Sequence, residues 1–205
     1  LFMAVDHEGN GANFVRIRSG MTTIPSQLTV GATWSDARAE ELGKIVGQEL
    51  ASIGINMLFG PVVDVVDDPT ASWRGNMGLR VFGGNPQWVG KLGRAYIRGV
   101  HDGSSRRVIT VAKHFPGHGG SNRNPDDEVA VLSQTLEDLR EMDLIPFFTV
   151  TETRDNDPMG VTDALMSSHI DYQRRVKGPV SLTSDEEGIG SVTQLLKEPE
   201  FSEWR

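Results

Sequence analysis

Short apolar runs alternate with longer segments of helical periodicity along most of the chain. The apolar runs cover residues 1–5, 55–59, 62–66, 108–112 and 164–168. Strands that alternate with helices pair in parallel, because each helix carries the chain back to the starting edge of the sheet. The pattern therefore predicts an α/β fold with a parallel sheet, either open or closed into a barrel.

Local signals mark where the intervening helices begin. Ser35 precedes one helical pattern as a candidate N-cap, and Asn85 followed by Pro86 is a cap with proline at the first helical position. Shorter helices are predicted over 136–142 and 184–197. Because no repeat and no linker interrupts the pattern, we expect residues 1–205 to form a single domain.

Four predicted strands, of which the second joins the runs at 55–59 and 62–66, each end in an ionisable side chain. These residues are Asp6, Asp64, the pair Lys113 and His114, and His169. A strand end can be polar merely because it reaches water. In parallel α/β proteins, however, the carboxyl ends of all strands point to one rim, and this rim carries the active site. Four such positions, one of them a Lys-His pair, favour a common site over the simpler explanation.

Composition excludes several classes of function. The chain has no cysteine, so neither a disulfide framework nor thiolate chemistry is expected. Its formal net charge of -8 does not suit a nucleic-acid partner, because such binding needs clustered Lys and Arg. No stretch approaches the roughly 20 apolar residues of a membrane span. Leu1 lies inside an apolar run, so we expect the natural start upstream, and no compartment is predicted.

No metal or cofactor is predicted. His114 and His118 have the spacing of helical metal ligands, but Pro116 and Gly117 between them interrupt a helix. The glycines over 117–120 are not followed by the Lys-Ser or Lys-Thr pair of a phosphate-binding loop. These glycines are better explained as bends near the rim.

Five sequence blocks occur in a fixed order and span nearly the whole chain. They are AVDHEG at 4–9, NMLFGPVVDV at 56–65, LRVFG at 79–83, VAKHFPGHG at 111–119 and LMSSH at 165–169. Together they resemble the motifs of glycoside hydrolase family 3, on its β-N-acetylglucosaminidase side. The combination is highly specific, although no block alone would be.

The resemblance implies a (β/α)8 TIM-type barrel, of which residues 1–205 would be the N-terminal catalytic barrel domain, incomplete at both ends. It also implies hydrolysis of terminal β-linked sugars, above all β-N-acetylglucosaminides, with retention through a carboxylate nucleophile. The expected partner is thus a carbohydrate substrate. A β-glucosidase of the same family and a non-catalytic carbohydrate-binding relative are the alternatives.

The same resemblance implies the residues that hold the sugar in the -1 subsite. They are Asp6, Arg16, Arg80, Lys113 and His114. A carboxylate accepts hydrogen bonds from two hydroxyls, and Arg and Lys donate without any change of protonation. Two additional residues separate Arg16 from the block at 4–9, relative to the family pattern.

The loop that carries the acid/base in the family departs from its Asp-x-His pattern. Asn124 stands where the family has the Asp, and Asp126 stands where it has the His. Asp126 is the candidate acid/base, because desolvation over a bound sugar would raise the pKa of its carboxyl. The alternative is a solvated acidic residue at the start of a helix, which leaves the acid/base unassigned.

The nucleophile of the family lies in a late Ser-Asp motif, which the resemblance places beyond Arg205. The sequence Ser184-Asp185-Glu186-Glu187 imitates such a motif, but it precedes a predicted helix. Ser184 and Glu187 have the spacing of a capping box, and acidic residues suit the positive end of a helix. We therefore interpret this segment as a cap.

Replacing Asp185 with Asn tests this interpretation. Because a first-turn carboxylate stabilises a helix by about 0.3–1 kcal/mol, we expect a loss of that size in the free energy of unfolding. Turnover should stay nearly intact, as measured with a chromogenic β-N-acetylglucosaminide in the whole protein. A large loss of turnover with normal folding would instead make Asp185 catalytic.

Overall fold

A four-stranded parallel sheet forms the centre of the computed structural model. It consists of β1 (Ala4–Val5), β2 (Met57–Leu58), β3 (Ile109–Phe115) and β5 (Ala164–Ser167), paired in the order β1-β2-β3-β5. Every pair is parallel. The predicted parallel α/β sheet is thus confirmed. Most of its strands are shorter than the apolar runs that predicted them. The structure describes residues 1–9, 16–17, 19–66, 77–117, 130–132, 136–154, 156–168, 170–173, 179–181, 195–197 and 199–204.

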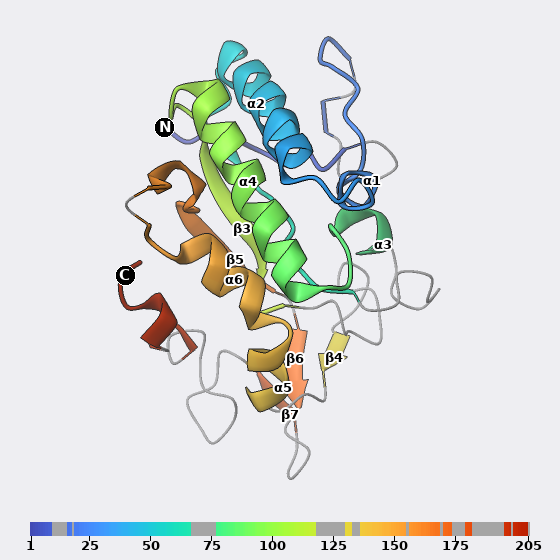
Figure 1. The fold of residues 1–205 in the computed structure, drawn as a ribbon, viewed down its shortest axis with the longest axis vertical. Coiled ribbons are helices and arrows are strands. Elements are labelled where there is room, and N and C mark those ends of the chain that lie inside the picture. The colour runs from blue at the N-terminus through green and yellow to red at the C-terminus, as the bar shows by residue number, and fades with distance from the viewer. Residues whose placement is uncertain are drawn as a thin grey trace.

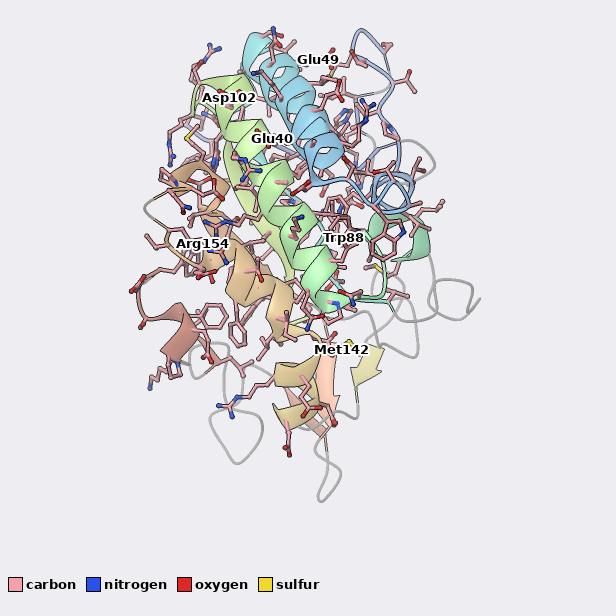
Figure 2. All side chains as sticks on the ribbon, viewed as in Figure 1. Glu40, Glu49, Trp88, Asp102, Met142 and Arg154 are labelled. Atoms are coloured by element: carbon pink, nitrogen blue, oxygen red, sulfur yellow. The ribbon has the colours of Figure 1, made fainter. Side chains whose placement is uncertain are left out.

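The longest helices lie side by side over one face of the sheet (Figure 1). They are α2 (Asp36–Ser52) and α4 (Pro86–Ser104). Glycines allow their backbones to approach closely: a Cβ at Gly47 would lie 2.3 Å from the Val100 carbonyl oxygen, and one at Gly99 would lie 2.1 Å from that of Glu40. Ion pairs lie on their polar outer faces, where Figure 2 labels Glu40 and Asp102.

The caps agree only in part with the prediction. The Asn85 side chain accepts a hydrogen bond from the Trp88 backbone N–H at 2.8 Å, so this predicted cap is confirmed. Helix α2 begins directly after Ser35, but the Ser35 side chain makes no capping hydrogen bond. Instead Asp36, in the first turn, accepts from the Ala37 backbone N–H at 3.1 Å.

Helix α6 (Leu144–Thr151) was not predicted from the sequence, although it helps to build the core. Its inner face buries Leu144, Phe147 and Val150. Phe147 packs edge-on against Phe115 at the end of β3, with ring centroids 5.2 Å apart. The aromatic contact fixes the end of the strand that also carries Lys113 and His114.

The remaining elements are short. They include α1 (Gln27–Gly31), α3 (Met77–Arg80), α5 (Leu136–Glu141) and the 3-10 turns Pro158–Gly160 and Pro199–Phe201. A second sheet pairs β4 (Ala130–Leu132), β6 (Ile170–Gln173) and β7 (Pro179–Ser181), with β6 and β7 antiparallel. No apolar run or other local pattern in the sequence predicted this sheet. Most of the predicted helix over 184–197 lies outside the described residues.

None of the helices in the described part of the chain is both long and apolar enough to cross a membrane.

Candidate active site

The carboxyl ends of β1 and β3 and the segments that follow β2 bring the predicted residues together. Asp6 follows β1, while Lys113 and His114 lie near the end of β3. Val62 pairs with Lys113, which carries the chain past β3 and places Asp64 beside His114. Helix α3 supplies Arg80 from its last turn. His169, His118, Asp126 and residues 184–187 lie outside the described residues.

Glu8 is the residue around which the other charges gather. Its Oε1 lies 2.5 Å from Lys113 Nζ. Arg80 grips the same carboxylate with two donors, Nε at 2.6 Å from Oε2 and Nη2 at 3.1 Å from Oε1. The side chains of Glu8 and Lys113 are each 2% exposed, and that of Arg80 is 4% exposed. This is a buried triad of one carboxylate and two cations, drawn from three separate elements.

The neighbouring cations keep Glu8 ionised. Burial alone would raise the pKa of Glu8, but the charge of Lys113 and the hydrogen bond and charge of Arg80 outweigh it, so the pKa lies below its ordinary value. A buried carboxylate in this state compensates two positive charges that would each be costly to bury alone. The triad therefore forms a buried set of paired charges beneath the rim.

Asp6 is the carboxylate of the cluster that solvent can reach. Its Oδ1 accepts a hydrogen bond from Lys113 Nζ at 2.7 Å. The Asp6 side chain is 25% exposed, whereas that of Lys113 is 2% exposed. Lys113 thus bridges an inner carboxylate, Glu8, and an outer one, Asp6. The arrangement leaves Asp6 able to accept hydrogen bonds from hydroxyl groups of a ligand.

A bulge in β3 lets two consecutive side chains reach the site. In the pairing with β5, Lys113 is opposite Met166 and Phe115 is opposite Ser167, so His114 is the additional residue. In a regular strand, neighbouring side chains point to opposite faces. The His114 ring instead turns to Asp64, with Nδ1 2.7 Å from Asp64 Oδ2.

Arg16 is joined to the segment after β1 through its backbone. Its backbone N–H donates to the Asp6 carbonyl at 3.4 Å, which brings it beside the end of β1. The residue itself is exposed. Its assignment to the sugar subsite therefore stays a prediction.

Asp6 and Glu8, which follow β1, both contact Lys113, and His7 lies between them in the sequence. Asp6 and Glu8 share a face because side chains two residues apart point the same way. This periodicity could have identified Glu8 from sequence, although our prediction named only Asp6. Between them, His7 is 4% exposed, and neither ring nitrogen has a hydrogen-bond partner in the described residues. Burial lowers the pKa of His7, although the charge of Glu49 opposes this shift.

The described side chains do not suggest a metal centre. No group of three or more His, Asp or Glu within the described ranges is arranged to hold an ion. The carboxylates of the rim are instead matched by Lys113, Arg80 and His114.

A parallel β/α sheet whose strand ends gather ionisable side chains has the architecture of an α/β enzyme, with the sheet either open or closed into a barrel. Comparison with known proteins identifies the family. Residues 1–197 match the Glycosyl hydrolase family 3 N terminal domain, and the chain belongs to this family.

Relatives in two bacteria carry the name beta-hexosaminidase. The protein of Hydrogenovibrio crunogenus is 31% identical over 180 residues, which cover 85% of this chain and 46% of the relative. The protein of Thiobacillus denitrificans is 34% identical over 178 residues, covering 84% of this chain and 45% of the relative. The chain therefore spans about half the length of these relatives.

Solved structures of proteins from the same family have a similar fold. A glycoside hydrolase family 3 beta-N-acetylglucosaminidase from Paenibacillus sp. is 29% identical with a TM-score of 0.72, over 84% of this chain and 30% of that one. NagZ from Neisseria gonorrhoeae, in complex with N-trifluoroacetyl-D-glucosamine, is 29% identical with a TM-score of 0.69, over 87% of this chain and 50% of that one. The fold is that of a TIM-type barrel, of which the parallel sheet and its helices are a part.

Replacing Glu8 with Gln tests the role of the triad. The change leaves two buried cations without their carboxylate, so we expect the free energy of unfolding at pH 7 to fall by about 3–5 kcal/mol. A carboxylate with a lowered pKa stabilises the fold above its unfolded-state pKa. This contribution is lost as the pH falls through the folded-state value.

The difference between wild type and Glu8→Gln should therefore shrink below about pH 4.3, the ordinary pKa of a glutamate. Denaturant unfolding at several pH values measures it. The matched control is Glu41→Gln, because Glu41 pairs with Arg38 on the surface, with side chains 59% and 66% exposed. A Glu8→Gln protein as stable as the control at pH 7 would contradict the role of the triad.

Proposed function

We propose that the whole protein hydrolyses terminal β-linked N-acetylglucosaminides with retention of configuration. The observation that carries the proposal is the cluster of Asp6, Lys113 and His114 at the carboxyl ends of the strands, supported from below by Glu8 and Arg80. The names of the relatives support N-acetylglucosamine as the sugar. Residues 1–205 would contribute the sugar-binding part of the catalytic barrel.

Each side chain of the rim has a defined part in this proposal. Asp6 accepts hydrogen bonds from sugar hydroxyls, and these bonds strengthen as the ring flattens towards an oxocarbenium-like transition state. Lys113 holds Asp6 in place through its hydrogen bond to Oδ1. Because the cations and carboxylates are already paired before the sugar arrives, little reorganisation is needed during the reaction.

The groups that break the glycosidic bond are assigned from sequence. Asp126 is the proposed acid/base, and the nucleophile is proposed to follow Arg205. The charged triad does not supply either group, since Glu8 is buried and engaged by two cations. A retaining mechanism needs one carboxylate to attack the sugar and a second group to protonate the leaving oxygen.

Hydrolysis of two chromogenic substrates distinguishes the candidate activities. The whole protein should cleave p-nitrophenyl β-N-acetylglucosaminide much faster than p-nitrophenyl β-glucoside. A preference for the glucoside would favour the β-glucosidase. Sugar binding by calorimetry without hydrolysis of either substrate would favour the non-catalytic relative, which Asn124 in the acid/base loop makes a specific alternative.

Asp6→Ala should lower kcat/KM by at least about a hundredfold, because a charged hydrogen bond that strengthens in the transition state is lost. The control is Asp102→Ala, which removes an exposed pair with Lys44 on the outer helices. Circular dichroism should show both variants folded. Unchanged kcat/KM in Asp6→Ala would remove Asp6 from the sugar site.

Asp126→Asn should impair substrates according to their leaving group. A general acid is needed most when the departing oxygen is basic, so cleavage of an alkyl β-N-acetylglucosaminide should fall far more than that of a dinitrophenyl one. Asp127→Asn, one residue further along the same segment, is the control. Equal losses for both substrates would leave the acid/base unassigned.

A further inference from the structure

We propose that Asp64 is a positioning residue, which holds the His114 ring with its proton on Nδ1 and thereby makes Nε2 an acceptor for a sugar hydroxyl. The part that concerns the sugar rests on the proposed function. The part that concerns the proton rests on the geometry around the ring alone.

Asp64 contacts His114 with both carboxylate oxygens. Oδ2 lies 2.7 Å from the ring Nδ1, and Oδ1 accepts a hydrogen bond from the His114 backbone N–H at 3.3 Å. An ionised carboxylate only accepts, so the short contact requires a proton on Nδ1. The Asp64 side chain is 0% exposed, which keeps bulk water from competing for this hydrogen bond. The two contacts fix both the orientation and the tautomer of the ring.

The other ring nitrogen, Nε2, faces a hydrogen-bond donor. Arg80 Nη2 lies 3.4 Å from His114 Nε2. A guanidinium has donors and no acceptor, so a proton on Nε2 would point at another N–H. Arg80 is itself held by the Glu8 carboxylate at 2.6 Å and cannot turn away without breaking that contact. Asp64 and Arg80 thus favour the same tautomer from opposite sides of the ring.

This tautomer gives the rim a matched donor and acceptor. Nη2 of Arg80 donates to Nε2 of His114, and a hydroxyl that enters between them takes the place of this long contact, accepting from Nη2 and donating to Nε2. The His114 side chain is 12% exposed, so it is accessible while Asp64 behind it is not. If the proton moved to Nε2, both groups would be donors, and the hydroxyl proton would lose its acceptor.

A second carboxylate–histidine pair provides a control outside the rim. His101 Nε2 lies 2.8 Å from Asp163 Oδ2, and its Nδ1 lies 2.7 Å from the Met159 carbonyl oxygen. Asp163 also accepts from the Thr110 backbone N–H at 2.7 Å. This pair ties α4 to the segment before β5, away from Asp6 and Lys113. It shares the chemistry of Asp64–His114 without a place in the proposed site.

The test is Asp64→Asn, which preserves the shape of the side chain. The His114 backbone N–H still needs an acceptor, so the amide oxygen should face it and the amide NH2 should face Nδ1. The proton of the ring then moves to Nε2. Nitrogen-15 NMR of histidine-labelled whole protein should show this exchange for His114, whose signals are assigned with His114→Gln.

We expect kcat/KM for p-nitrophenyl β-N-acetylglucosaminide to fall about tenfold to a hundredfold in Asp64→Asn, the size of loss seen when the partner that orients a metal-binding histidine is changed. Asp163→Asn should change only the His101 signals and leave kcat/KM as in wild type. A His114 that keeps its proton on Nδ1 in Asp64→Asn would overturn the proposal, as would an unchanged kcat/KM after the proton has moved. A wild-type protein that cleaves no β-glycoside would contradict the proposed function, while the NMR result would still decide the role of Asp64 in setting the tautomer.

Discussion

The buried carboxylate of Glu8 is the interaction on which the rest of the site depends. It pairs with Lys113 from β3 and with Arg80 from α3, so it connects three elements that are far apart in sequence. Burying any one of these charges alone would cost several kcal/mol, and only their mutual contacts make the arrangement stable. The position of Lys113 in turn determines where Asp6 lies, and the position of Arg80 constrains His114.

The strands and their packing give this charged cluster a fixed frame. Phe115, next to His114, is locked between Phe147 of α6 and Phe201 of the C-terminal turn, with ring centroids 5.2 Å and 5.7 Å away. Asp64 holds the His114 ring from the segment after β2. The pairing of Val62 with Lys113 places Asp64 beside this ring. Charges held on packed strands need little rearrangement when a ligand arrives, which is what binding a polar sugar requires.

Elements that depend on local patterns were predictable from the sequence, whereas elements that depend on distant contacts were not. The parallel strands and the Asn85 cap were predicted, because apolar runs and capping residues are local signals. Helix α6 was missed because its apolar residues face the core on several sides and show little periodicity. Ser35 was assigned a capping hydrogen bond that it does not make.

The sequence by itself determined the parallel sheet, the family and the candidate rim residues Asp6, Arg80, Lys113 and His114, because these depend on local periodicity and on motifs with a fixed order. The tertiary structure alone decided which of these charges are buried and which partner each one has. It made Glu8 the centre of the cluster and Asp64 the partner of His114, since the pairing of β1, β2 and β3 joins residues some 50 to 110 positions apart. Hydrogen bonds and ion pairs act over a few ångströms in space, and no pattern along the chain records those distances.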